Sequence, residues 1–299
     1  EGSFLVLPGM EITSDYLYPG VNQAGERRIH ATALNTGSEP DWNFDDPDKS
    51  DIIRTQIERT RNSGGLAILN HPNYRYQLEL KDILDAGTVS HMEIFNAHPR
   101  SNHEGHAGFR PGIESLWDQV LSTGQQVYGV AADDAHDFKW YRQWLRRFGG
   151  APPGGAWIMV KASGLSADAI TSAISQGNFY SSTGVHLQSV LAEAGAFSVT
   201  LDREKTLEEV SHNWVRKAAP IVPSDDSHFV IEFIGPHGRI LASTHDHDVA
   251  SISLEGLTGY VRAKVTYLDK ISSLTGADNA RAYFAWTQAV MIGNQGSGE

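Results

Sequence analysis

The stretch Gly129-Val-Ala-Ala-Asp-Asp-Ala-His136 places two carboxylates and an imidazole directly after a short apolar run. The run, residues 127–132, predicts a buried strand. In parallel α/β architectures the carboxyl ends of the strands carry the chemistry. Asp134 and His136 lie two residues apart, so they could chelate one metal ion or pair as acid and base. An isolated D-x-H is more often a polar turn with a helix cap, but similar residues follow other predicted strands of this chain.

Those other positions recur through the first half of the chain. The full set of candidate metal ligands is Glu11, His30, His71, Glu93, His98, Asp134 and His136. Each lies near the end of a predicted strand, and each taken alone could be an ordinary loop or strand residue. Oxygen and nitrogen ligands without thiolate suit zinc, manganese or iron. Two or three such ions would clamp a phosphate, and one could generate a hydroxide nucleophile at neutral pH.

The composition of the chain narrows the possible functions. It has 299 residues, of which 40% are hydrophobic and 20% charged, so one large domain or two smaller ones with a real core are expected. A net charge of −12 argues against nonspecific nucleic-acid binding. The absence of cysteine excludes disulfides and thiolate chemistry. No apolar run approaches the ~20 residues that span a membrane, and no signal peptide is present.

Strands and helices alternate as far as Gly177, and the pattern changes after Gly184. The alternation predicts an α/β layer or barrel. Beyond Gly184, period-two segments such as residues 260–267 predict a β-sandwich. We therefore expect an α/β domain over residues 1–184 and a β-sandwich domain over residues 185–299. The segment His245-Asp-His-Asp248 has the composition of a metal site, but its place in a predicted loop favours a solvated turn.

Two basic segments have alternative interpretations. Residues 99–111 contain Arg100 and Arg110, which would offer cations to an anionic substrate if this loop covered the site. A solvated surface loop explains the same residues equally well. Residues 139–148 interleave basic and aromatic side chains, and a helix that packs its tryptophans is favoured there over nucleic-acid binding.

Four segments resemble successive motifs of the PHP (polymerase and histidinol phosphatase) superfamily. They are Pro-Gly-Met-Glu11-Ile, Leu-Asn-His71-Pro, Met-Glu93-Ile-Phe-Asn96 and Asp133-Asp-Ala-His136. The segment from Ala156 to Gly184 is similar to the end of that domain in a bacterial branch related to carbaryl hydrolase. The β-rich second half is also similar to that branch, as is the closing strand Tyr283 to Ile292.

The resemblance implies a distorted (βα)7 barrel with a two- or three-metal site and hydrolytic activity, usually on phosphoesters. Glu11 would bridge two metals, His71 would ligate one of them, and His30 would belong to the side of the third. Asp134 and His136 would form the closing pair. For the remaining ligand, His98 is preferred because it lies just beyond the predicted strand 89–95. Glu93, inside that strand, is the alternative.

One departure from the family pattern concerns the beginning of the sequence. The family opens with H-x-H on its first strand, and no such motif precedes Glu11. Because the chain begins at Glu1 and not at Met, we expect that the natural N-terminus is missing or that part of the metal site has been lost. Either case implies a barrel that is incomplete at its N-terminus, and unpaired edge strands favour association into a homo-oligomer.

The functional prediction is a metal-dependent hydrolase, with a small-molecule phosphoester as the first substrate class. Metal-bound hydroxide would attack phosphorus, and the metals together with Arg100 or Arg110 would stabilise the developing charge. The same site would also serve a carbamate, amide or ester carbonyl. The alternative from another class is a degenerate PHP domain that acts as a binding module. The family resemblance alone suggests an extracytoplasmic bacterial location.

Overall fold

The structure is a computed structural model that describes residues 4–15, 28–42, 46, 48–138, 151–212, 228–271 and 279–293. The basic aromatic segment 139–148 lies outside these residues. Within them, no helix is both long enough and apolar enough to cross a membrane. The helices are α1 (Lys49–Asn62), α2 (Leu80–Ala86), α3 (Ile113–Ser122), α5 (Ala167–Ser175) and α6 (Arg203–His212). Two short 3-10 turns cover Tyr74–Tyr76 and Pro236–Gly238.

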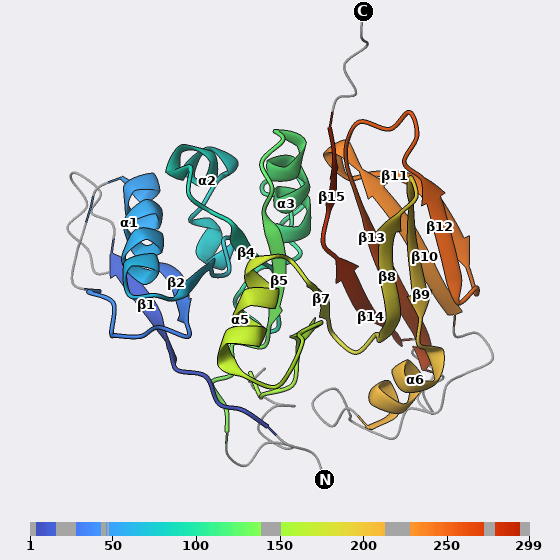
Figure 1. Ribbon diagram of the computed structural model, residues 1–299, viewed down its shortest axis with the longest axis horizontal. Helices are drawn as coiled ribbons and strands as arrows, with labels where there is room; N and C mark the ends of the chain where they lie inside the picture. Colours follow the sequence, from blue (N-terminus) through green and yellow to red (C-terminus); the bar gives the residue numbers. More distant parts are fainter. Residues whose placement is uncertain are drawn as a thin grey trace, which may run out of the picture.

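The first sheet carries most of the candidate ligands. Its strands, in spatial order, are β1 (Gly9–Asp15), β2 (Arg28–Leu34), β3 (Leu66–Leu69), β4 (His91–Asn96) and β5 (Tyr128–Ala132). β1 pairs antiparallel with β2 and β2 with β3, whereas β3, β4 and β5 run parallel. Helices α2 and α3 follow β3 and β4 in the chain (Figure 1). The carboxyl ends of β3, β4 and β5 therefore meet at one edge of this sheet.

Apolar side chains on both faces hold this sheet in place. α1, α2 and α3 pack on one face through Ile53, Ile83 and Trp117, all of them fully buried. On the other face, Ile174 of α5 packs against Ile68 of β3. Helix α1 begins at Asp48, whose side chain accepts hydrogen bonds from the backbone of Ser50 and Asp51. Asp48 is therefore the N-cap of α1, and its carboxylate satisfies backbone N–H groups of the first turn.

Two antiparallel sheets make up the rest of the molecule. One has the spatial order β11 (Arg239–His245), β10 (His228–Gly235), β13 (Gly259–Ile271), β14 (Asn279–Thr287), β7 (Phe179–Ser182) and β6 (Trp157–Val160), with β15 (Val290–Ile292) on β13. The other contains β12 (Val249–Ser253), β9 (Ala196–Leu201) and β8 (Leu187–Glu193). Phe197 of β9 and Phe233 of β10 meet in a core that both sheets share. The two sheets form layers beside the α/β region (Figure 1).

The two regions are joined through strands that precede Gly184. β6 and β7 belong to the seven-stranded sheet, because β7 pairs with β14 through Ser182 and Ala285. The backbone of Gly129 in β5 exchanges hydrogen bonds with the Gln288 side chain at 2.8 and 2.9 Å. A side chain at Gly129 would collide with Ile94. The chain is therefore an α/β region followed by a β-rich region, and the boundary near Gly184 stays a prediction.

Two expectations differ from the structure. The (βα)7 barrel is not confirmed, since the described residues form an open five-stranded sheet in which only three strands are parallel. The apolar run over residues 4–7 predicts a short strand, and the structure forms none there. Phe4 and Val6 are exposed without strand pairing, and the strand begins at Gly9 because it pairs with Leu34 of β2.

Candidate metal centre

Three of the predicted ligands converge where β1, β2 and β3 lie side by side. Glu11 extends from β1, His30 from β2, and His71 follows β3 by two residues. His30 Nδ1 lies 3.0 Å and His71 Nε2 3.5 Å from the same carboxylate oxygen, Glu11 Oε1. One ligand atom from each residue lies within 4.8 Å of the others. This is the only group of three or more such side chains, within the described residues, that meets this spacing.

Asn70 holds Glu11 in this position. Its amide nitrogen donates to Glu11 Oε1 at 2.9 Å. Its amide oxygen accepts hydrogen bonds from the backbone and hydroxyl of Thr32, at 3.1 and 3.0 Å. Because both ends of the amide are occupied, the orientation of Asn70 is fixed by β2, and Glu11 is fixed in turn.

The histidine rings meet the requirements of a nitrogen ligand. The Nε2 atom of His30 is buried and has no hydrogen-bonding partner within the described residues. His30 Nδ1 lies 3.0 Å from Glu11 Oε1, so this nitrogen is the one that could share a cation with Glu11. The rings of His30 and His71 lie edge to face with 4.9 Å between centroids. The donor set of one carboxylate and two imidazoles therefore fits a divalent cation such as zinc.

A second cluster of predicted ligands lies at the ends of β4 and β5. Glu93 is almost completely buried, and its Oε2 accepts hydrogen bonds from the backbone of His71 at 2.7 Å and from Asn96 at 2.8 Å. The same Asn96 amide group donates to Asp134 Oδ2 at 3.3 Å. Glu93 thus connects the second cluster to the first through the residue His71.

Asp134, His136 and His98 complete the second cluster. His136 Nδ1 lies 3.5 Å from Asp134 Oδ1 and 2.7 Å from the Asp134 carbonyl oxygen. The rings of His98 and His136 meet edge to face at 4.9 Å. Asp134 has φ of +48°, a left-handed conformation that is uncommon for a non-glycine residue and often found at functional sites. The predicted D-x-H pair is therefore brought together after β5, and its role as a ligand pair stays a prediction.

Charge interactions perturb the ionisation of both clusters. Burial opposes ionisation of Glu11, but hydrogen bonds from His30 and His71 outweigh it and hold the Glu11 pKa well below its usual range. Burial favours neutral His71, but the Glu11 and Glu93 carboxylates outweigh it and raise the His71 pKa. Burial raises the pKa of Glu93 to about 7, and the positive charge of His71 opposes this shift. Burial lowers the pKa of His98.

The two predicted arginines differ in position. Arg110 forms an ion pair with Glu79, the N-cap residue of α2, at 2.5 Å. The charge of Arg110 is therefore neutralised at the start of α2. Arg100 is exposed, and its backbone nitrogen donates to His98 Nδ1 at 3.1 Å. Only Arg100 is therefore placed beside a candidate ligand by a hydrogen bond.

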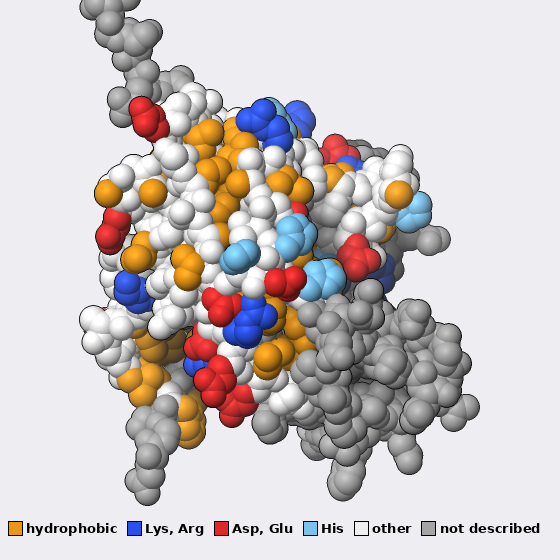
Figure 2. Space-filling view, turned by 90° about the vertical axis from the view of Figure 1, so that its right-hand side faces the viewer, with side chains coloured by type: hydrophobic (Ala, Val, Ile, Leu, Met, Phe, Trp, Pro, Cys, Tyr) orange, Lys and Arg blue, Asp and Glu red, His pale blue; other side chains and the backbone are white. Residues whose placement is uncertain are grey.

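The His245–Asp248 segment behaves as a turn. All four residues are exposed, on the side of the molecule where β12 lies in Figure 1. Viewed from that side, histidine and acidic side chains are interspersed on the surface (Figure 2). Asp248 pairs with Arg203 at 2.7 Å, and Asp246 accepts a hydrogen bond from the backbone of Phe229. These bonds close the end of β11, as expected of a solvated turn.

Sequence reasoning missed two positioning residues, Asn70 and Asn96. Both lie in the strand-end motifs that carry the family resemblance, but no role was assigned to either. The available signal was their place at the carboxyl ends of β3 and β4, where a side-chain amide can orient a neighbouring carboxylate. What the sequence could not show is that their partners, Glu11 and Asp134, come from other strands.

Comparison with known proteins adds one distant similarity. No protein-family model matches the chain, and no curated protein matches it. Among solved structures, it is similar to a two-domain protein from Bacteroides vulgatus described as containing a predicted PHP-like metal-dependent phosphoesterase. The identity is 12%, the similarity covers 93% of this chain and 75% of that chain, and the TM-score is 0.36. A TM-score this low carries no argument about fold or function.

Proposed function

We propose that this protein is a metal-dependent hydrolase that holds a divalent cation between Glu11, His30 and His71. The observation that carries the proposal is the convergence of three ligand atoms within 4.8 Å, with His30 Nδ1 and His71 Nε2 both facing the same oxygen of Glu11. A divalent cation at such a site would supply Lewis-acid chemistry and lower the pKa of a water molecule.

The protein's own residues prepare the site for that cation. The lowered pKa keeps Glu11 ionised at neutral pH, so a ligand with a full negative charge is present. Asn70 orients this carboxylate, and the backbone of His71 is anchored by Glu93. Such outer contacts reduce the freedom of the ligands and strengthen metal binding.

The second cluster extends the proposed site. Asp134 and His136 lie at the end of β5, and His98 packs against His136. Glu93 and Asn96 connect them to His71. We propose that these residues bind a further metal ion and contact the reacting group of the substrate. The Arg100 guanidinium would then be the positive side chain nearest to an anionic substrate.

The proposed substrate class is a small phosphoester. The support comes from the resemblance of the Glu11, His71, Glu93 and Asp134 segments to PHP motifs. The exposed Arg100 next to His98 also suits an anionic group. A carbamate remains the second substrate class, because a related branch of the superfamily acts on that bond and the same site would serve.

Metal content and hydrolysis, measured together, test the proposal. The chain is loaded with zinc or manganese, desalted, analysed for metal, and assayed with bis(p-nitrophenyl) phosphate and a p-nitrophenyl carbamate. We expect at least one bound equivalent and hydrolysis of the phosphodiester, both lost in His71→Ala. His247→Ala, an exposed histidine outside both clusters, is the matched control and keeps both. A folded wild-type chain that binds no metal overturns the proposal.

A further inference from the structure

A cavity lies apart from the metal centre. It has a volume of about 610 Å³ and lies between β6 and β7 on one side and β8 on the other. Pockets for small molecules commonly have volumes of about 300–1,000 Å³. None of the candidate metal ligands lines it. The proposed hydrolase site therefore does not explain this cavity.

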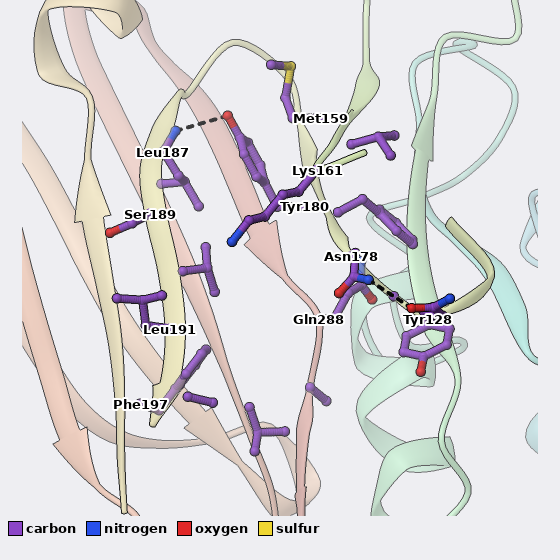
Figure 3. A pocket seen from close by; sticks show the side chains of 18 of the residues that line it. Tyr128, Met159, Lys161, Asn178, Tyr180, Leu187, Ser189, Leu191, Phe197 and Gln288 are labelled. Atoms are coloured by element: carbon purple, nitrogen blue, oxygen red, sulfur yellow. Dashed lines mark hydrogen bonds between the residues drawn. The ribbon is translucent and has the colours of Figure 1, made fainter. Parts of the chain in front are cut away.

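Its walls are mostly apolar and come from separate parts of the fold (Figure 3). Met159 and Tyr180 stand on one side, Leu187 and Leu191 of β8 on the other, and Phe197 of β9 lies beneath them. The hydroxyl of Tyr180 accepts a hydrogen bond from the Leu187 backbone at 3.0 Å, which joins the two walls. An apolar body would therefore be in contact with two different sheets.

The end of the cavity next to β5 is shaped by a close contact between Tyr128 and Gly177. Tyr128 of β5 lines it, and the ring lies where a β-carbon on Gly177 would stand. Gly177 has φ of +74°, a conformation that glycine adopts readily. This end of the cavity is thus set by the packing of the α/β region and not by a surface loop alone.

Two lysines lie beside these apolar walls. Lys161 and Lys205 both line the cavity, and neither forms an ion pair with a carboxylate within the part of the chain that the structure describes. Figure 3 shows the Lys161 side chain extending between Tyr180 and β8 with its amine directed toward β8. Asp202, the acidic residue of the lining, accepts a hydrogen bond from the Lys205 backbone at 3.0 Å. The Asp202 carboxylate offsets one of these two lysine charges, and Lys161 is the cation that extends across the cavity (Figure 3).

We propose that this cavity binds a small anionic amphiphile, a molecule with an apolar body and a carboxylate. The apolar body would lie against Tyr180, Leu187 and Phe197, and the carboxylate would pair with Lys161. Two other polar groups of the lining already have partners. His186 Nε2 lies 3.5 Å from Glu209 Oε2, and the Gln288 amide exchanges hydrogen bonds with the Gly129 backbone, so Lys161 is the group that the carboxylate would meet.

The chemistry of the lining selects this ligand class over others. A neutral apolar molecule would make no use of the Lys161 amine, which extends across the cavity (Figure 3). A compact anion such as inorganic phosphate would leave the apolar walls uncovered. A carboxylate on an apolar chain satisfies both, and a charge-assisted hydrogen bond to lysine is stronger than one between neutral groups.

Displacement of a fluorescent probe tests the proposal on the full chain. The protein is titrated with 1-anilinonaphthalene-8-sulfonate, an anionic aromatic dye, and the bound dye is then displaced with decanoate or with decanol. We expect saturable dye binding, displacement by decanoate, and an affinity for decanol lower by about tenfold, the factor that a charge-assisted hydrogen bond supplies. Absence of saturable binding, or equal affinity for the acid and the alcohol, overturns the proposal.

Two variants locate the binding. Lys161→Met keeps the length and apolar stem of the side chain, so decanoate affinity should fall about tenfold while decanol affinity stays unchanged. Lys81→Met removes an exposed lysine of α2 as the matched control and should leave both unchanged. Leu187→Trp fills the cavity and should abolish binding of both, with thermal unfolding as the check on folding. Wild-type binding by folded Lys161→Met or Leu187→Trp protein overturns the assignment.

Discussion

Two groups of charged side chains connect separate elements of this protein, and they differ in their charge balance. In the Arg262 network, Arg262 and Lys264 of β13 meet Glu114 and Asp118 of α3, so two cations face two carboxylates. In the metal cluster, the carboxylates of Glu11, Glu93 and Asp134 have no lysine or arginine ion pair within the described residues, and their neighbours are histidines. The first group is neutral overall, and the second has an excess of negative charge.

The Arg262 network has a structural role. Arg262 is almost completely buried, holds Asp118 in a bidentate pair at 2.7 Å and lies 4.9 Å above the Trp117 ring. Tyr260 also donates to Asp118, at 2.8 Å. These contacts join α3 to β13 and so connect the α/β region to the seven-stranded sheet. Among the described residues, no lysine or arginine pairs with the carboxylates of the metal cluster, and the divalent ion proposed above would supply positive charge there.

The largest expected effect is on the Arg262 network. Asp118→Ala leaves a buried guanidinium without its bidentate partner, and we expect a loss of about 3–5 kcal/mol in the free energy of unfolding, measured with urea. Asp85→Ala breaks an exposed ion pair with Lys81 on α2 and should cost about 1 kcal/mol or less. Equal losses in the two variants would mean that the network does not join the two regions.

The next effect concerns the metal cluster. Zinc at a hundredfold excess over its dissociation constant should stabilise the wild-type chain by about 2.7 kcal/mol, because the cation binds the folded state. His30→Ala should remove this stabilisation, and a chelator should reverse it in the wild type. His247→Ala is the control and should respond like the wild type. If zinc stabilises His30→Ala to the same extent, the cation binds elsewhere. The contrast between the metal cluster and the Arg262 network then fails.

The comparison also shows what the sequence could and could not predict. Apolar runs followed by acids and histidines correctly indicated strand ends, so His71 and Asp134 were found before their neighbours in space were known. The sequence could not show that β1 pairs antiparallel with β2, because hydrophobic periodicity does not specify which strand is the partner. The same limit explains why β6 and β7 were assigned to the α/β domain, although they pair within the other sheet.

The Arg262 network was missed for a related reason. Residues 260–267 alternate as a strand, and the alternation places Tyr260, Arg262 and Lys264 on one face. A face with two cations is typical of a solvent-exposed surface. In the structure α3 covers it, and Glu114 and Asp118 supply the compensating charges. Local patterns cannot reveal such compensation, because the partners are more than 140 residues away in the chain.

A smaller effect tests the contacts that orient the metal ligands. Asn70→Ala removes the amide that holds Glu11 against β2, and loss of such an outer contact typically weakens metal binding 10–100-fold. Zinc affinity measured by calorimetry should fall by this factor, and loss of the two bonds from Thr32 should also cost the metal-free chain about 1–3 kcal/mol. Asn178→Ala, in the lining of the other cavity, is the matched control. An unchanged zinc affinity in Asn70→Ala would show that Glu11 needs no orienting partner.

The smallest expected effect is the pH dependence that Glu114 contributes to stability. Burial disfavours the ionised carboxyl, but Arg262 and Lys264 outweigh it and lower the Glu114 pKa to about 2 from 4.5. The unfolded chain therefore binds more protons at this residue between those pH values, so the stabilisation is complete above pH 4.5 and falls as the pH drops toward 2. Because Glu114 is 24% exposed, solvent screens its pairs, and we expect a contribution of about 1 kcal/mol.

Comparing unfolding free energies at pH 5 and pH 3 isolates this contribution. Glu114→Gln should lose less stability than the wild type over that range, since its amide does not titrate. A chelator keeps both chains metal-free, so that proton competition at the metal cluster is the same in each. Glu11→Gln provides the parallel measurement, because the Glu11 pKa is lowered by hydrogen bonds from histidines and not by a permanent cation. If the unfolding free energies of the wild type and Glu114→Gln fall in parallel, Arg262 and Lys264 do not stabilise the ionised carboxylate. The Arg262 network would then not differ from the metal cluster in charge balance.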